Sequence, residues 1–354
     1  MVRGRLLADS GDAVPEPFRA WADQIHTRPG EEGTYVVALK RLGPAPSPRP
    51  FLHLALFVLA FLSATVAGGF LQGVDALSTT FAEIGGTWVP VPTELDLASL
   101  RLGLPFSLAF IGILLGHELG HYFAARRHRI PVSLPYFIPF PPYFSIVGTL
   151  GAFIRLRGPM AKRSVLFDIG VAGPVVSFVL SVPVLVVGLG LSEVIPTSGP
   201  SPLHPFMIQF LGEPIRIGTS ALLVLITNLS VPEYQAGYSV SLHPLAFAGW
   251  LGIFVTALNL LPLGQLDGGH ILYAMLGERQ RWFGWGFVAL MAPLGLVWWG
   301  WWLWGGIAVA VSRGRIGHPP VLMDGVEIDR KRLILGWAAV IVFVACFSPA
   351  PLSF

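Results

Sequence analysis

The residues of this sequence that are best suited to chemistry stand together in His117-Glu118-Leu119-Gly120-His121. On an α-helix, His117 and His121 lie one turn apart on the same face, so both imidazoles can bind one metal ion. Glu118 lies beside them and is free to act on a water molecule at that metal. The spacing therefore predicts a site for metal-assisted hydrolysis on a helix.

A catalytic zinc site needs a third protein ligand and one open position for water. The sequence has one cysteine, Cys346, so the candidates for this ligand are carboxylates in other apolar segments. Asp267 is favoured because Pro262 before it and two glycines after it break the helix, which lets its side chain approach a metal. Asp168 is the alternative, but it follows two basic residues and can pair with them at a membrane surface.

The composition places these residues in a membrane. Hydrophobic residues make up 53% of the 354 residues and charged residues 12%, against roughly 25% charged residues in an ordinary soluble domain. This excludes most soluble classes. A charged residue at the centre of a spanning helix costs about 2.5–3.5 kcal/mol on insertion scales, so ionisable residues there are expected to be functional. The net charge of +3 is small, and basic residues form short clusters between apolar stretches, which indicates topology signals and no nucleic-acid partner.

The apolar stretches predict an all-α polytopic membrane protein with about five to six transmembrane helices. They cover residues 51–72, 102–116 with the adjoining histidines, 169–191, 244–266, 282–312 and 333–354, and a shorter stretch lies at 217–232. Counting basic residues places the N-terminus, the loop 126–163 and residues 279–281 on one cytoplasmic side. Residues 282–312 are too long for one upright helix and too short for two full spans. A short hairpin there would keep the later basic clusters on the same side.

We divide the chain into a polar N-terminal cytoplasmic segment at 1–50, an intramembrane core at 51–281 and C-terminal transmembrane segments at 282–354. The first apolar core begins only after Pro50, so we expect no cleavable signal peptide. Within the N-terminal segment, residues 33–40 have the composition of a strand.

Small and polar residues also stand near the candidate ligands. Gly112, Gly116 and Gly120 recur at a spacing that permits close helix packing beside the histidines. His270 follows the Asp-Gly-Gly turn, but a catalytic site keeps its fourth position open, so we expect a supporting role for it.

Together these motifs resemble the site-2 protease family of intramembrane zinc metalloproteases. The resemblance rests on the membrane-embedded HELGH and on a second apolar helix that ends in NxxPxxxxDGG at 259–269. It extends from about residue 101 to about residue 277 and includes the strand-like 148–157. No polar stretch is long enough for a PDZ or CBS domain, and the run at 243–250 resembles a PDZ-less branch found in bacteria and plastids.

The family pattern implies one catalytic Zn²⁺ held by His117, His121 and Asp267, with Glu118 as the catalytic base. Zinc would polarise the scissile carbonyl and acidify a water molecule, while Glu118 would accept the proton and return it to the leaving amine. The implied activity is that of an intramembrane zinc endopeptidase of HExxH type, which cuts within or near transmembrane helices in regulated intramembrane proteolysis. The implied partners are transmembrane protein substrates and the lipid bilayer.

The family also implies that residues 148–157 form a small membrane-associated β element whose edge pairs with an unwound substrate. Such pairing would satisfy the backbone groups that the substrate frees when its helix unwinds. Asn259 resembles a polar position near the active site of the family. Its amide can donate to a developing oxyanion or hold the substrate backbone, and it can equally bridge two helices.

We expect a multi-pass integral protein of the bacterial cytoplasmic membrane, with its active site toward the cytoplasmic side. A membrane transporter or ion channel is the alternative function, because it would also bury His, Asp and Asn on broken helices. Glu118 argues against transport, which gives no reason for a glutamate next to the first histidine. No inverted repeat of that segment is visible either.

Overall fold

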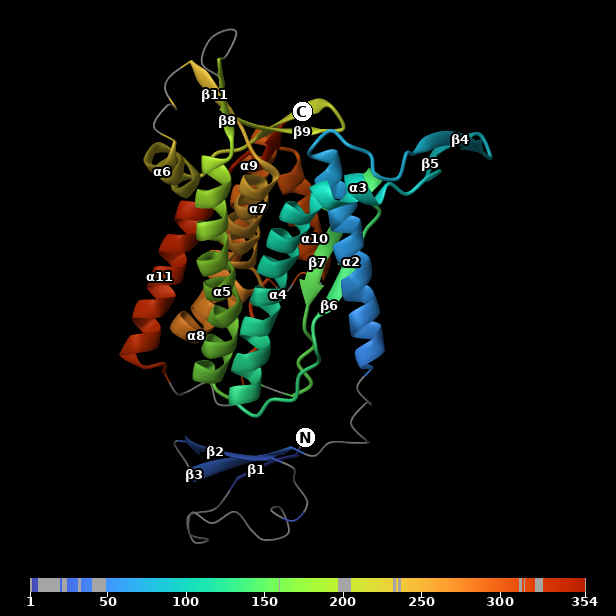
Figure 1. Cartoon of the computed structure of the whole chain (residues 1–354). Helices are drawn as coiled ribbons and strands as arrows, with labels where there is room; N and C mark the ends of the chain where they lie inside the picture. The colour runs from blue at the N-terminus through green and yellow to red at the C-terminus, as the bar shows by residue number, and fades with distance from the viewer. Residues whose placement is uncertain are drawn as a thin grey trace.

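The computed structural model in Figure 1 is a bundle of upright helices with small sheets at its ends. It describes residues 2–5, 20, 24–30, 33–39, 49–158, 160–196, 205–231, 234, 237–311, 314, 316–321 and 327–353. Among these residues, three helices are long and apolar enough to cross a membrane, namely α2 (Pro50–Phe70), α4 (Leu104–Arg127) and α5 (Arg163–Gly190). They confirm three predicted spans, while the total of five to six is not confirmed.

The remaining helices are shorter. They are α3 (Leu97–Leu100), α6 (Ala221–Ser230), α7 (Pro244–Asn259), α8 (Asp267–Leu276), α9 (Gln280–Val297), α10 (Gly300–Val311) and α11 (Arg330–Cys346), with 3-10 turns at Arg101–Gly103, Pro142–Phe144 and Gly277–Arg279. Helix α5 lies at the centre, because it contacts α4, α7, α8 and α11. Pro174 and Pro183 lie inside α5 without ending it.

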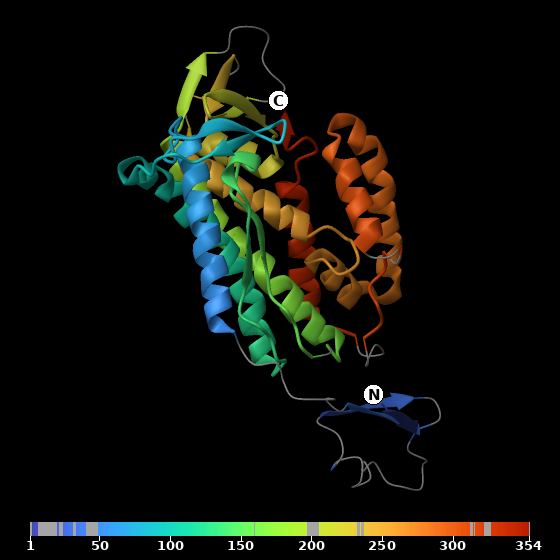
Figure 2. The same ribbon diagram turned by 90° about the vertical axis from the view of Figure 1, so that its right-hand side faces the viewer.

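Helices α9 and α10 form a short hairpin, the arrangement of residues 282–312 that would keep the later basic clusters on the same side. Only Trp298 and Trp299 separate them, and the two helices pack against each other. Figure 2 shows them side by side, in orange. The start of α9 and the end of α10 therefore lie at the same end of the hairpin. The basic residues before α9 and at the start of α11 therefore lie at one end of the bundle.

The chain holds more β structure than the sequence predicts. A five-stranded sheet, in the order β12-β10-β9-β11-β8, lies beyond the C-terminal end of α5. Its strands are β8 (Glu193–Pro196), β9 (Phe206–Phe210), β10 (Glu213–Ile217), β11 (Tyr238–Ser241) and β12 (Leu352–Ser353). The sequence did not predict this sheet. These strands are two to five residues long and pair across large separations, as Ile217 does with Leu352, so they leave no periodic signal.

Three smaller sheets complete the fold. Strands β6 (Tyr136–Pro139) and β7 (Thr149–Phe153) pair antiparallel, as do β4 (Thr80–Ile84) and β5 (Thr87–Val91). Near the N-terminus, β1 (Val2–Arg5), β2 (Gln24–Gly30) and β3 (Gly33–Leu39) form an antiparallel sheet in the order β1-β3-β2. Strand β7 lies where the sequence predicts the membrane-associated β element, and β3 matches the predicted strand at 33–40.

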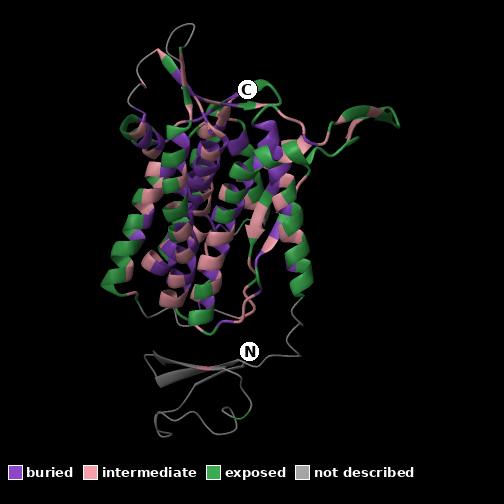
Figure 3. Cartoon of the chain, viewed as in Figure 1, coloured by how far each residue is buried: buried purple, intermediate pink, exposed green. Residues whose placement is uncertain are grey.

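The pattern of burial is that of a bundle surrounded by lipid. Figure 3 shows buried residues in the middle of the bundle and exposed ones on the outer faces of α2 and α11. Those outer faces are apolar: Leu54 and Leu62 of α2 are 59% and 47% exposed, and Ile341 of α11 is 69% exposed. An exposed apolar surface of this extent does not face water in a monomeric soluble protein. The outer faces are therefore suited to lipid.

Candidate metal centre

Three of the predicted site residues meet at one point in the bundle. His117 and His121 come from α4, and Asp267 is the first residue of α8. The Nε2 atoms of the two histidines are 3.0 Å apart, and each lies 3.3 Å from Oδ2 of Asp267. The three ligand atoms lie within 4.8 Å of one another. The sequence linked α4 and α8 only through the ligand types that they carry, and the structure shows that the two helices are neighbours at this point.

The donor set fits a catalytic zinc ion. Two imidazole nitrogens and one carboxylate oxygen are ligands that catalytic zinc uses, and three protein ligands leave a fourth position for water or substrate. His117 is 4% exposed and His121 is 7% exposed, so both ligands lie deep in the bundle. These three residues would hold the ion.

Each histidine is fixed by a contact at its other ring nitrogen. Nδ1 of His121 lies 2.7 Å from the carbonyl oxygen of Ile169, and Nδ1 of His117 lies 3.2 Å from Oγ of Ser177. Ser177 Oγ is also 2.9 Å from Oγ1 of Thr256, which joins α5 to α7 behind the histidine. Supports of this kind set the tautomer and the ring orientation of metal ligands. Both rings can therefore carry their proton on Nδ1 and present Nε2 to a metal.

Ser177, Thr256 and the Ile169 carbonyl are supports that the sequence did not predict. The two hydroxyls lie inside apolar helices, where a small polar residue usually makes a bond between helices, and that was the only available signal. A carbonyl carries no signal in the sequence, because every residue has one.

Close packing of α4 on α5 depends on Gly120 of α4 and Gly173 of α5. A Cβ atom on Gly120 would lie 2.7 Å from the carbonyl oxygen of Ala172, and one on Gly173 would overlap the His121 ring. Gly116 also meets α5, at the side chain of Leu180. Gly112 has open space around it, so the predicted packing role holds for two of the three glycines on α4.

Helix α7 ends at Asn259, and a short turn carries the chain to Asp267. Gly268 and Gly269 belong to this geometry, because a Cβ atom on either would overlap the backbone of the turn at 260–264. Pro262 lies within the turn, and its carbonyl oxygen accepts a bond of 2.9 Å from Nε2 of Gln280. The helix break predicted around Pro262 is confirmed, and it brings Asp267 to the histidines.

Glu118 and Asn259 both lie at the centre. Glu118 is 7% exposed and lies against the backbone of Ile154, the residue that follows β7. Nδ2 of Asn259 is 3.5 Å from Nε2 of His117. The structure therefore brings together all five residues that the sequence singled out for the site.

Asp168 is held elsewhere. Its carboxylate accepts two bonds of 2.7 Å from Nε and Nη2 of Arg332, and its Oδ2 lies 2.9 Å from Nε2 of His128. It therefore joins the ends of α4, α5 and α11, and its partners are not the basic residues before it that the sequence suggested.

His270 packs its ring on that of His318, with ring centres 4.9 Å apart, and is not part of the ligand cluster.

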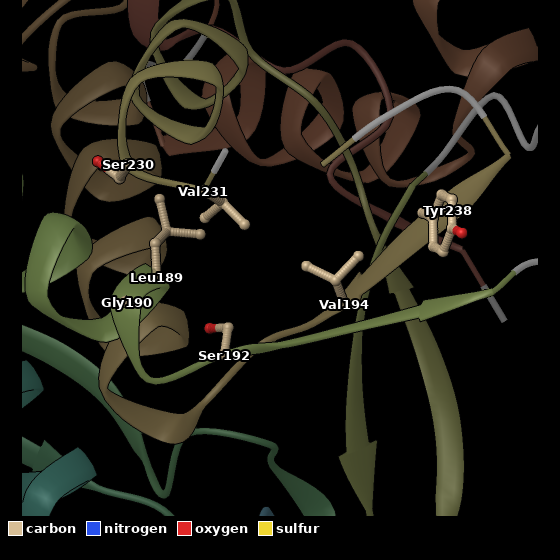
Figure 4. A pocket seen from close by; sticks show the side chains of 7 residues that line it. All are labelled: Leu189, Gly190, Ser192, Val194, Ser230, Val231 and Tyr238. Carbon is tan, nitrogen blue, oxygen red and sulfur yellow. The ribbon is translucent and has the colours of Figure 1, made fainter. Parts of the chain in front are cut away.

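The pocket in Figure 4 is not part of the metal centre. It has a volume of about 490 Å³ and is lined by residues that include Leu189 and Gly190 of α5. Leu189 follows Gly173, which abuts His121, by sixteen residues, or about 24 Å along the helix. A larger hollow of about 1020 Å³ lies behind the turn at 260–266, between that turn, α9 and α10.

Comparison with known proteins agrees with this geometry. The model of peptidase family M50 matches residues 105–287, slightly more than half of the chain. The probable zinc metalloprotease EGY1, chloroplastic, of Oryza sativa subsp. japonica is 32% identical over 317 residues, which cover 85% of this chain and 50% of that protein. The protein of the same name from Arabidopsis thaliana is 34% identical over 269 residues, covering 73% and 45%. The chain thus spans about half the length of the curated relatives it matches. No solved structure matches it.

The matched region begins one residue into α4 and runs past α8, so it contains both histidines, Glu118 and Asp267. The chain belongs to peptidase family M50, the site-2 protease family of metalloproteases.

Proposed function

We propose that this chain is an intramembrane zinc endopeptidase that hydrolyses peptide bonds within or near transmembrane helices of other membrane proteins. The observation that carries this function is the meeting of His117, His121 and Asp267 inside an apolar bundle, with Glu118 beside them. Ionisable residues at such depth are costly and are kept for function. Membership of the M50 family supports peptide hydrolysis in preference to transport.

The residues have separate roles in this reaction. A zinc ion held by the two histidines and Asp267 supplies Lewis acidity for the carbonyl group and for water. Glu118 is the general base, which takes a proton from the attacking water and returns it to the leaving amine. Asn259 lies next to His117, where its amide can donate to the oxyanion or to the substrate backbone.

We propose that the substrate binds as a strand beside β7. Strand β7 pairs with β6 on one side and contacts α4, and the backbone that follows it at Ile154 lies against Glu118. A substrate helix shields its peptide bonds, so the substrate must unwind, and an added strand satisfies the groups that it frees. The pairing places the substrate backbone next to the proposed base.

The active site lies toward the basic end of the bundle, which we propose is the cytoplasmic side. His121 precedes Arg126 and Arg127 on α4 by five to six residues, which is about 8 Å along the helix. We propose that the membrane is crossed by α2, α4, α5, the pair α7 and α8, and α11, while α9 and α10 form a hairpin that enters from the basic side. This topology places all the basic clusters on one side of the membrane. This gives five crossings, within the predicted range.

The relatives are named as chloroplast proteins, and they do not support the bacterial cytoplasmic membrane that the sequence suggested. We therefore propose only that the protein crosses a membrane several times, with its active site on the basic side. Regulated intramembrane proteolysis and transmembrane protein substrates remain part of the proposed function.

The metal assignment is tested by measuring zinc in the purified full-length chain. We expect one zinc ion per chain in the wild type, and loss of zinc in His117→Ala and in Asp267→Asn. Asp168→Asn is the matched control, because it changes a carboxylate that binds Arg332 and lies outside the cluster. Wild-type protein without zinc, or loss of zinc in Asp168→Asn but not in Asp267→Asn, would contradict the assignment.

A further inference from the structure

The β4 and β5 hairpin, residues 80–91, has no role in the metal centre. It follows α2 on the side away from the basic clusters, and Figure 1 shows it extending sideways from the end of α2, across the direction of the helices. Among the described residues, its only extensive contact is between its own two strands. Six of its ten strand residues are exposed, the other four are partly exposed and none is buried, so the described bundle buries neither face of the hairpin.

The uncovered side chains of the hairpin are apolar. Phe81 and Trp88 are each 65% exposed, and Ile84 is 60% exposed. Two more exposed leucines follow along the chain: Leu95, before α3, is 59% exposed, and Leu97, the first residue of α3, is 69% exposed. Apolar residues this exposed and this close together mark a surface that binds something.

A two-stranded hairpin without a partner is marginally stable in water at best. The turn of this one is well formed, because Gly85 and Gly86 both have positive φ, as a tight turn with right-handed twist requires. The strands pair in register from Thr80 opposite Val91 to Ile84 opposite Thr87. A hairpin with such defined pairing, and with little packing against the described part of the bundle, needs a further surface to cover it.

The hairpin needs an apolar surface for its side chains and polar partners for its strand edges, and the bilayer interface offers both. The apolar side chains need an apolar surface, while the outer edges of two strands carry unpaired backbone groups, which are not tolerated in the hydrocarbon core. Trp and Tyr gather at the membrane interface because that layer satisfies an apolar ring and a polar group together. The chain continues from the hairpin through α3 into α4, whose first turns are also apolar and exposed at this end of the bundle: Leu104 is 36% and Leu108 is 60% exposed.

We propose that residues 80–97 lie in the bilayer interface opposite the active-site side and anchor the junction between α2 and α4. The charges near the hairpin are acidic: Glu83 stands directly opposite Trp88 across the strands, and Glu94 lies between the hairpin and α3. The anchoring is therefore apolar, and it does not depend on anionic lipids. This proposal is independent of peptide hydrolysis.

The test uses the full-length chain with Trp88→Cys, labelled with an environment-sensitive fluorophore and reconstituted in phosphatidylcholine bilayers. The native Cys346 is 1% exposed, and labelled wild type gives its background. The control is Pro196→Cys, an exposed position at the end of β8, which extends away from the helices. Zinc content shows that each variant retains its fold.

We expect spin-labelled lipid to quench the probe at position 88 strongly and aqueous iodide to leave it unchanged, with the reverse at position 196. Replacing Phe81 by Asp in the same protein should restore quenching by iodide at position 88. Access of iodide without that replacement would show that the hairpin is in water. Protection from both quenchers would show that protein covers it, either a second copy or a further segment of the chain. Either result overturns the proposal.

Discussion

Nδ1 of His121 lies 2.7 Å from the carbonyl oxygen of Ile169, and this contact ties the second histidine of the metal centre to the neighbouring helix. Gly173, one turn further along α5, leaves the space into which the His121 ring fits. The orientation of the ligand therefore depends on α5 as much as on α4.

Gly173→Ala tests this dependence. The new Cβ would overlap the His121 ring, so we expect zinc affinity to fall about 10–100-fold, the range seen when the outer support of a metal ligand is lost. Gly190→Ala is the matched control, because it makes the same change in α5 where no atom lies within 4 Å of the new group. Competition with a chelator measures the affinity. Equal loss in both variants would show a general effect on the helix.

Gln280→Met tests the support behind Asp267. Gln280 is fully buried; it donates to the Pro262 carbonyl and accepts a 2.9 Å bond from the His318 amide. Methionine of similar size removes both bonds, so we expect a loss of stability of about 1–3 kcal/mol. We also expect weaker zinc binding, since Pro262 belongs to the turn that carries Asp267. The control is Gln265→Met, an exposed glutamine in the same turn. Unchanged thermal unfolding and zinc affinity in Gln280→Met would refute this role.

Asp168 and Arg332 should be coupled in stability. The bidentate pair joins α5 to α11, and the two side chains are 26% and 31% exposed. Solvent screens a pair this accessible, so we expect a coupling of about 1 kcal/mol in a double-mutant cycle of Asp168→Asn and Arg332→Gln. Lys331→Gln is the control on the same helix. Additive effects of the two substitutions would mean that the ion pair contributes nothing.

Asp75 gives the loop after α2 a defined dependence on pH. Burial acts to raise the pKa of its carboxyl, but hydrogen bonds from Thr79, Leu77 and Tyr143 outweigh it and hold the pKa below its ordinary value. A pKa lowered by folding contributes stability that is present above about pH 4 and is lost as pH falls through the folded value. Wild type should therefore lose more stability on acidification than Asp75→Asn. Thermal unfolding across acidic pH measures this, with the exposed Glu94→Gln as control. Parallel pH curves would contradict it.

The spacing of residues was enough to predict the ligands, and the lengths of the apolar stretches were enough to predict the long helices. His117 and His121 needed only the period of a helix, and Asp267 needed only the helix break at Pro262. The contacts that orient the histidines could not be predicted from the sequence. The bond from His121 to Ile169 joins segments that are distant in sequence, and it uses a carbonyl group, which every residue has. The five-stranded sheet was missed for a related reason, since Ile217 pairs with Leu352 from the far end of the chain.

The central claim, that Glu118 acts as the base of a zinc peptidase, is tested most directly by one rate. The measurement compares wild type with Glu118→Gln in cleaving a single-span membrane protein in the same bilayer, with zinc content determined for both. We predict that Glu118→Gln retains zinc and cleaves about 10²–10⁴-fold more slowly, the contribution typical of a general base. Cleavage by Glu118→Gln at the wild-type rate would contradict the claim.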